Sequence, residues 1–162
     1  MATTAQRQHL HTLAYALQPF AGQLDYPPGD QRTNRDGQWW AMSEQTAEHV
    51  LKGGGRLQAD CSEFCAWLMK CCGLWHWAGP GYTGSHLDTI TPHYTDGSEA
   101  LLGALVVFGG GTGHHEAMVM AHDPKGDPLC VSHGRPGLDF LRVSQIAAYQ
   151  PPGITYLSIN HR

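Results

Sequence analysis

The hydrophobic pattern of this 162-residue chain changes once, from helical spacing in its first half to short strands in its second half. Apolar residues before position 75 recur at intervals of three and four, which is the spacing of one face of an α-helix. After position 103 the chain holds short apolar segments separated by turns that contain glycine and proline. Helices followed by successive strands favour an α+β domain with an antiparallel sheet over a repeated β-α-β arrangement.

Three helices are expected in the first half. One covers Thr4–Gln18 and is ended by a proline, and a second begins with Ser43 as its cap and reaches Lys52. The third follows Asp60, which is placed to be its N-cap, and ends at Gly73. Its apolar face is expected to consist of Cys61, Phe64, Cys65, Leu68 and Cys72.

Two long loops and five strands complete the expected fold. Glycine, proline and polar residues predict loops over Ala21–Met42 and Trp75–Ser98. The expected strands, each bounded by a turn signal, are Ala104–Phe108, His115–Ala121, Leu129–His133, Leu138–Val143 and Ile154–Ile159.

Composition indicates one compact domain that covers residues 1–162. Hydrophobic residues make up 41% of the chain and charged residues 15%, enough apolar surface to offset the entropy of ordering it. The net charge is −4 and the 10 lysines and arginines are scattered, which argues against a nucleic-acid partner. We find no secretory signal and no apolar run of membrane-spanning length, so we expect a monomer made in the cytoplasm without membrane insertion.

The five cysteines are expected to be reduced thiols. Their number is odd, two of them are adjacent, and three lie where a helix would bury them, so a disulfide framework is not favoured. The sequence has no C-x-x-C pair, and a structural zinc site is correspondingly disfavoured. No metal or other cofactor is expected.

Cys61 differs from the other cysteines because it lies at the first turn of the expected third helix. The positive end of the helix dipole and the unsatisfied backbone N–H groups there favour a thiolate. Cysteine-based acyl transfer also needs an imidazole, a group that orients the imidazole, and donors for the oxyanion. The sequence therefore predicts that a strand end supplies a histidine to Cys61.

Three histidines occupy such strand ends. His114 and His115 lie where a glycine turn enters one strand, and His133 lies where the next strand leaves. If these strands form a hairpin, His115 and His133 come close together. Strand alternation places His115 with Ala117 and Val119 on a face expected to pack on the Cys61 helix, and His114 on the other face or in the turn, where it remains an alternative base.

The segments "DCSEF", "LVVFGGGTGHHEAMV" and "VSHG", in this order, resemble the NlpC-like cell-wall cysteine peptidases. The closest likeness is to the peptidase domains of endolysins from bacteriophages of actinobacteria, in which an upstream tyrosine, a "YTG" loop and a closing "TYL" strand also occur. The resemblance covers nearly the whole chain. It implies a papain-like fold, with helices before the sheet and the nucleophile at a helix N-terminus packed on a five- to six-stranded antiparallel sheet.

The resemblance also implies roles for individual residues and a substrate. Cys61 would be the nucleophile, His115 the general base, and His133 the residue that fixes the tautomer of His115. Tyr26 would supply an oxyanion donor. The supporting residues beside these groups are Asp60, Ser62 and His114.

The implied activity is cleavage of an amide bond in the stem peptide of bacterial peptidoglycan through a thioester acyl-enzyme. Access to the wall would follow permeabilisation of the membrane by a holin. The sequence departs from the family at Glu63, Ala104, Glu116 and Ala117. The two glutamates add negative charge near the expected cleft.

Two other functions remain open at this point. One is a zinc-dependent N-acetylmuramoyl-L-alanine amidase, with His115, His133 and a cysteine such as Cys130 as metal ligands. The other is a cell-wall-binding module that has kept the fold without the chemistry.

Overall fold

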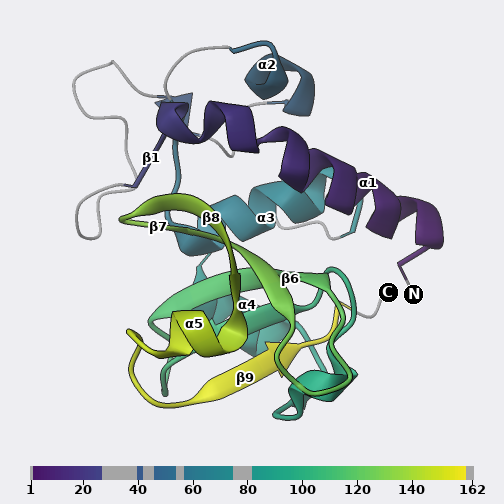
Figure 1. Cartoon of the computed structure of the whole chain (residues 1–162), viewed down its shortest axis with the longest axis vertical. Coiled ribbons are helices and arrows are strands. Elements are labelled where there is room, and N and C mark those ends of the chain that lie inside the picture. Colours follow the sequence, from purple (N-terminus) through teal and green to yellow (C-terminus); the bar gives the residue numbers. More distant parts are fainter. Residues whose placement is uncertain (1, 27–39, 42–45, 54–56, 75–81, 160–162) are drawn as a thin grey trace.

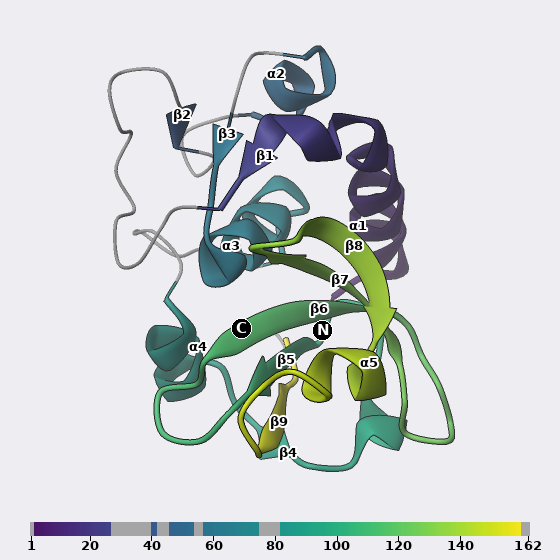
Figure 2. The ribbon, with the colours of Figure 1, turned by 60° about the vertical axis from the view of Figure 1, so that its left-hand side comes forward.

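The computed structural model describes residues 2–26, 40–41, 46–53, 57–74 and 82–159, and it is an α+β structure (Figure 1). Helices α1 and α3 cover one face of a six-stranded antiparallel sheet, and α5 lies across the other face (Figures 1 and 2). The strand order is β4-β9-β5-β6-β7-β8. The α+β class and the antiparallel sheet therefore agree with the sequence-based expectation.

The elements of this fold are short and closely spaced along the chain. The helices are α1 (Thr4–Ala16), α2 (Ala47–Leu51), α3 (Cys61–Cys71), α4 (Thr83–Thr89) and α5 (Val143–Ala147), with 3₁₀ turns η1 (Gln18–Gln23) and η3 (Gly97–Glu99). The main sheet contains β4 (His93–Tyr94), β5 (Leu105–Phe108), β6 (His115–Ala121), β7 (Leu129–Gly134), β8 (Gly137–Arg142) and β9 (Ile154–Leu157). A small parallel sheet is formed by β1 (Leu24–Asp25), β3 (Leu57–Gln58) and β2 (Trp40–Ala41).

Helix α3 forms as its sequence predicts. The side chain of Asp60 accepts a hydrogen bond from the backbone N–H of Glu63 at 2.8 Å, which caps the first turn. Gly73 follows the helix with a φ of 64°, a conformation that glycine adopts at little cost. The expected apolar face is buried throughout: Cys61, Phe64, Cys65, Leu68 and Cys72. The prediction for this helix is confirmed in its start, its end and its buried face.

The two faces of the main sheet carry separate hydrophobic cores. The core beneath α3 takes alternate strand residues such as Val107, Met118 and Val131, together with Phe64 and Leu68 of the helix. The opposite core takes the intervening residues and packs them against α5: Val106, Phe108, Ala117, Val119, Cys130, Val143 and Ile146. Each strand residue is thereby assigned to one face, and this assignment decides which site residues can meet α3.

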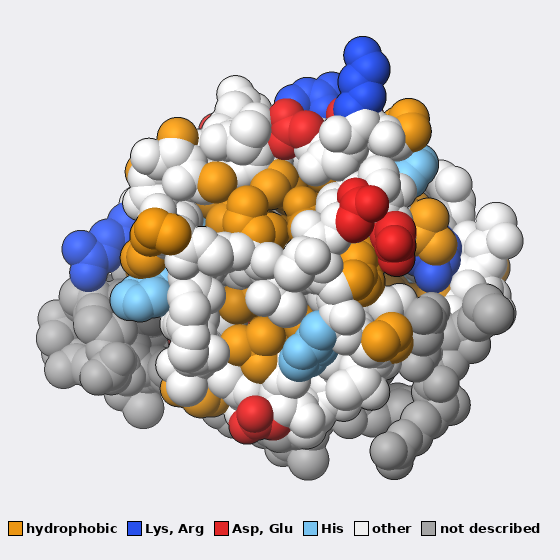
Figure 3. Space-filling view, turned by 90° about the horizontal axis from the view of Figure 1, so that it is seen from below, with side chains coloured by type: hydrophobic (Ala, Val, Ile, Leu, Met, Phe, Trp, Pro, Cys, Tyr) orange, Lys and Arg blue, Asp and Glu red, His pale blue; other side chains and the backbone are white. Residues whose placement is uncertain are grey.

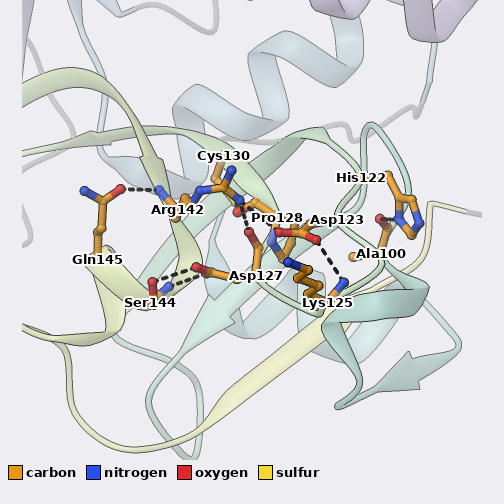
Figure 4. Close-up of polar contacts among 10 residues, drawn as sticks. All are labelled: Ala100, His122, Asp123, Lys125, Asp127, Pro128, Cys130, Arg142, Ser144 and Gln145. Carbon is orange, nitrogen blue, oxygen red and sulfur yellow. Dashed lines mark hydrogen bonds and ion pairs between the residues drawn. The ribbon is translucent and has the colours of Figure 1, made fainter.

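The β6–β7 turn is tied to α5 by a polar network on the surface (Figure 4). The guanidinium of Arg142 donates to the carboxylate of Asp123 at 3.0 Å and to the backbone carbonyl of Asp127 at 2.7 Å. The carboxylate of Asp127 in turn accepts from the backbone N–H and the hydroxyl of Ser144, both at 2.8 Å. Because these groups join the turn to the start of α5, the hairpin and the helix hold one another in place.

The five predicted strands are all present, and β6 has the predicted bounds. Helix α1 begins at Thr4 as expected and ends at Ala16, just before η1. Helix α2 is capped by Thr46 and is shorter than expected, while the proposed cap Ser43 lies outside the described residues. Helix α4 and strand β4 were missed inside the predicted loop Trp75–Ser98, as was α5 after β8.

The face of the molecule that is opposite to α1 shows hydrophobic atoms in shallow hollows between polar and backbone atoms (Figure 3). The lysine and arginine side chains visible in this view lie at its edges, and they do not form a patch. Among the described residues, no helix is both long enough and apolar enough to span a bilayer.

The packing of α3 on the sheet predicts a large stability effect at Phe64. Its side chain is fully buried beneath the helix, so Phe64→Ala should lower the free energy of unfolding by about 3–5 kcal/mol through lost burial and a residual cavity. Urea denaturation followed by tryptophan fluorescence measures this. The control is Leu101→Ala, at a side chain that is 53% exposed, which should change stability by under about 0.5 kcal/mol. Equal effects of the two substitutions would contradict the packing described above.

Candidate functional site

The candidate site lies where strands β6 and β7 stop pairing. Their register ends at Ala117 and Ser132, although β6 begins at His115 and β7 continues to Gly134 in its ladder with β8. Beyond this point the β7–β8 hairpin rises from the sheet toward β1 and α3 (Figures 1 and 2). The two strands separate at this point, and we refer to the gap between them as the strand opening. Cys61, the first residue of α3, lies beside the strand opening. The backbone N–H of Glu116 acts on its thiol as a hydrogen-bond donor, which favours the thiolate.

Tyr26 contacts the sulfur of Cys61. Its hydroxyl lies 3.8 Å from Sγ and donates to it. The small parallel sheet explains this meeting, because β1 leads directly to Tyr26 and β3 leads to Asp60 and α3. The backbone N–H of Ala59 also donates to the carbonyl of Asp25 at 3.1 Å. The structure therefore brings Tyr26 and Cys61 together, while the predicted role of Tyr26 as an oxyanion donor stays a prediction.

Asp60 and Ser62 serve the start of α3. One carboxylate oxygen of Asp60 accepts from the N–H of Glu63 and from the hydroxyl of Ser62, each at 2.8 Å. These contacts hold the carboxylate against its own helix, where its charge complements the helix dipole. Both residues therefore fix the first turn of α3, on which the position of Cys61 depends.

The expected thiolate at Cys61 is not found. Burial, and then the carboxylates of Asp60 and Glu116, raise the pKa of the thiol to about 12, although the Glu116 amide and the Tyr26 hydroxyl act against them. The side chain is only 5% exposed. A helix dipole contributes about 0.3–1 kcal/mol, whereas the loss of water around an ion costs several kcal/mol. Burial therefore outweighs the dipole, and the thiol is protonated at neutral pH.

His115 faces away from α3, contrary to the expectation from alternation. It lies with Phe108 and Ala117 on the α5 side of the sheet, and its ring centroid is 6.0 Å from that of Phe108. Its Nε2 lies 2.8 Å from Oγ of Ser132. Burial, and then the proximity of His133, lower the pKa of His115 to about 4. His115 therefore reaches the strand opening from the α5 side and is a neutral imidazole at pH 7.

His133 reaches the strand opening from the α3 side. Its ring centroid lies 5.4 Å from that of Phe64 and 5.7 Å from that of Tyr26. Its Nε2 lies 3.3 Å from the backbone carbonyl of Asp25, to which an Nε2–H can donate. Burial lowers its pKa, and nearby backbone carbonyls oppose this effect. Among the described residues, the hydrogen-bonding partner of the His115 ring is Ser132, and the predicted role of His133 in fixing the His115 tautomer is therefore not seen.

His114 is exposed, and its ring lies directly over Gly109. A β-carbon added to Gly109, whose φ is 87°, would stand 2.7 Å from Cδ2 of His114. His114 lies in the turn just before β6, which begins at His115. The alternative base of the sequence analysis is thus in the turn and lines the same cavity as His115.

A cavity of about 520 Å³ adjoins these groups. Its wall at the strand opening is formed by Tyr26, His114, His115 and Ser132. The β7–β8 turn, residues 134–137, and Tyr149 after α5 form the opposite wall. Because the hydroxyl of Tyr26 contacts Cys61, the cavity extends to a residue that touches the thiol.

Three residues near Cys61 were not assigned a role from sequence. Ser132 holds the ring of His115, and Glu116 and His86 form a fully buried pair beside α3. Glu116 had been identified only as a departure from the family pattern, and His86 lies in a segment predicted to be a loop. The sequence did contain one indication that Glu116 has a role, because it is an acidic residue inside an otherwise apolar strand.

The ligand set proposed for zinc does not converge. Cys130 packs in the core beside α5, while His133 faces α3 on the other side of the sheet. Within the described parts of the chain, no three His, Cys, Asp or Glu side chains are grouped to hold a metal ion. All five cysteines are free thiols, as expected.

The raised pKa of Cys61 predicts an unusual alkylation profile. The rate of reaction with iodoacetamide should stay low near pH 7.5 and rise only as the pH approaches about 12, because the thiolate is the reactive form. Mass spectrometry of the peptide covering residues 57–70 assigns the modified cysteine, with Cys61→Ser as the blank. A midpoint below pH 8 would contradict the protonated thiol described here.

The lowered pKa of His115 predicts a loss of stability in acid. The unfolded chain, in which a histidine has a pKa near 6.5, takes up the proton before the folded chain does. The stabilisation that depends on neutral His115 is complete above about pH 6.5 and is lost as the pH falls toward 4, by up to roughly 3 kcal/mol. Urea denaturation at pH 7.5 and 4.5 should show a smaller loss in His115→Gln than in the wild type. Equal losses would show that His115 is not the group responsible.

In comparisons with protein-family models, curated proteins and solved structures, nothing matches this chain. The case for a function therefore depends on the chemistry of the residues at the strand opening.

Proposed function

We propose that this chain is a cysteine peptidase that hydrolyses an amide bond in bacterial peptidoglycan. The observation that carries the proposal is the position of Cys61. It is the first residue of a capped helix, its sulfur is in contact with a tyrosine hydroxyl, and it adjoins a strand opening that two imidazoles approach. This arrangement agrees with the NlpC-like resemblance of the sequence, from which the substrate class is taken.

In the proposed reaction Cys61 attacks as a neutral thiol that loses its proton during the attack. This reaction requires the tautomer of neutral His115 that carries its proton on Nε2, 2.8 Å from Oγ of Ser132, so that Nδ1 can accept the thiol proton. The Cys61 sulfur forms a bond to the carbonyl carbon, and the imidazolium then returns the proton to the departing amine. Water hydrolyses the thioester with His115 again accepting a proton, which regenerates the thiol.

Two groups near the sulfur could donate to the oxyanion. The hydroxyl of Tyr26 already points at Sγ, and the backbone N–H of Cys61 lies at the start of α3, where helical N–H groups have no partner within the helix. The cavity beside Tyr26 is large enough for a short peptide segment and combines polar and apolar walls.

The thiol of Cys61 is protonated before substrate binds. Removing the proton must be coupled to substrate binding, because the carboxylates of Asp60 and Glu116 disfavour a thiolate in the empty site. Substrate that expels the remaining water would strengthen the electrostatic interactions within the site. The proposed enzyme would therefore be inert toward small electrophiles while remaining active on its substrate.

The test is digestion of purified peptidoglycan, followed by mass spectrometry of the muropeptides. The wild type should release new amino termini, and Cys61→Ala should reduce the release by at least about a thousandfold because the nucleophile is lost. Cys71→Ala is the matched control, since Cys71 is a half-buried thiol at the other end of α3. Ser132→Ala should lower kcat by about ten- to a hundredfold with little change in KM.

Other results would identify a different function. Release that persists in Cys61→Ala and is abolished by a chelator would indicate a metal-dependent amidase. Wild-type protein that sediments with cell walls without releasing amino termini would indicate a wall-binding module.

A further inference from the structure

A buried acid–base pair lies beside the proposed nucleophile and takes no part in the reaction described above. Nδ1 of His86 on α4 lies 2.8 and 2.9 Å from the two carboxylate oxygens of Glu116 on β6. Both side chains are 0% exposed. Removing two such groups from water is costly, so a contact of this kind is weak support for stability and requires another explanation.

Glu116 is linked to α3 through two different parts of the residue. Its backbone N–H lies against the sulfur of Cys61, and its carboxylate interacts with the thiol of Cys65, one helical turn further on. Glu116 also lies just beyond the last β6–β7 pair, at Ala117 and Ser132. The first residues of β6 therefore lack the β7 ladder that holds the rest of the strand.

Helix α4 packs against this same end of β6. Thr83 at its start lies 2.6 Å from where a β-carbon on Gly113 would stand, and Gly84 is 3.3 Å from the Thr112 side chain by the same measure. The turn that precedes β6 is thus covered by α4. The contact of His86 with Glu116 joins α4 to the strand one residue beyond the two adjacent histidines.

We propose that His86 and Glu116 are positioning residues that hold the start of β6 against α4, and thereby fix the Glu116 amide and His114–His115 relative to the Cys61 sulfur. This inference rests on the proposed function of Cys61 as a nucleophile. Neither residue contacts the substrate. Their contribution is to hold the start of β6, which lacks the β7 ladder, through a contact that also places the carboxyl group of Glu116 near the thiol.

The charged and titratable groups around Cys61 come from several elements. Asp60 precedes α3, Tyr26 follows β1, and Glu116 lies on β6, and all three enter the balance that sets the protonation of the thiol. His133 on β7 stands beside Tyr26, and His86 on α4 is paired with Glu116. Of these groups, Glu116 is the one that belongs to β6, the strand that begins at His115.

Two substitutions separate the charge of the pair from its mechanical role. Glu116→Gln keeps an oxygen that can accept from His86, so the strand should stay in place while the charge is removed. The alkylation midpoint of Cys61 should then move to lower pH, with the rate at pH 8 rising about tenfold for each unit of pKa. His86→Ala removes the contact, so amide hydrogen exchange across residues 113–118 should accelerate at least about tenfold.

The controls distinguish positioning from general destabilisation. Exchange across residues 138–142 of β8 should be unchanged in His86→Ala, and His86→Asn, whose amide can replace Nδ1–H as a donor, should restore protection at 113–118. Glu48→Gln and His93→Ala, both at exposed sites, should alter neither measurement.

Faster exchange throughout the chain in His86→Ala, or a Cys61 midpoint that is unchanged in folded Glu116→Gln, would overturn the proposal. These readouts do not depend on hydrolysis. If they behave as expected while wild-type protein releases no muropeptides, the positioning inference stands and the proposed function fails. If the wild type hydrolyses peptidoglycan and neither variant changes the readouts, the proposed function stands and the pair is a packing feature only.

Discussion

The structure around Cys61 depends on one feature of the sheet, namely that β6 begins at His115, before its pairing with β7 starts at Ala117. The pairing ends at Ala117 and Ser132, and the β7–β8 hairpin then leaves toward β1. This separation makes room for the N-terminus of α3. The backbone N–H of Glu116 therefore lies beside the sulfur of Cys61, where a paired strand would have offered it a carbonyl oxygen. In an unbroken ladder, that N–H would have had a backbone partner and the thiol would have faced a closed sheet.

The same feature explains the arrangement of the histidines. In an unbroken sheet, two histidine side chains on opposite faces could not both approach the same reacting group, because the backbone of the sheet would lie between them. At the strand opening, His115 comes from the α5 side and His133 from the α3 side, and His133 is close enough to lower the pKa of His115. The accompanying burial keeps the thiol protonated and His115 neutral. Two neutral groups contrast with a preformed thiolate–imidazolium pair, and they make proton transfer part of the proposed attack.

Much of the fold could be predicted from the sequence because its signals are local. The cap at Asp60, the apolar face of α3 and the glycine that ends it depend on neighbouring residues, and all three predictions are confirmed. The bounds of β6 also follow from its flanking turns. Helix α4 was missed because it is short and rich in Gly, Ser and Thr, residues that also favour loops.

The candidate site could be predicted only in part, because it depends on contacts between distant segments. Alternation along β6 separates His115 from Glu116, but it does not say which face α3 will cover. Here the larger side chains Met118 and Met120 fill the space beneath the helix, so Glu116 faces α3 and His115 does not. The pKa of Cys61 could not be predicted either, since helix position is visible in a sequence and depth of burial is not.

The central claim is that the Cys61 sulfur forms a covalent bond with the acyl group of its substrate. The most direct measurement is to mix the protein with soluble muropeptides, quench the reaction in acid within seconds, and map acyl adducts by tandem mass spectrometry. The account predicts a thioester at Cys61 in the peptide covering residues 57–70, with none at Cys65 in the same peptide and none in Cys61→Ser. Hydrolysis that proceeds with no adduct at Cys61, or with the same rate in Cys61→Ser, would contradict it.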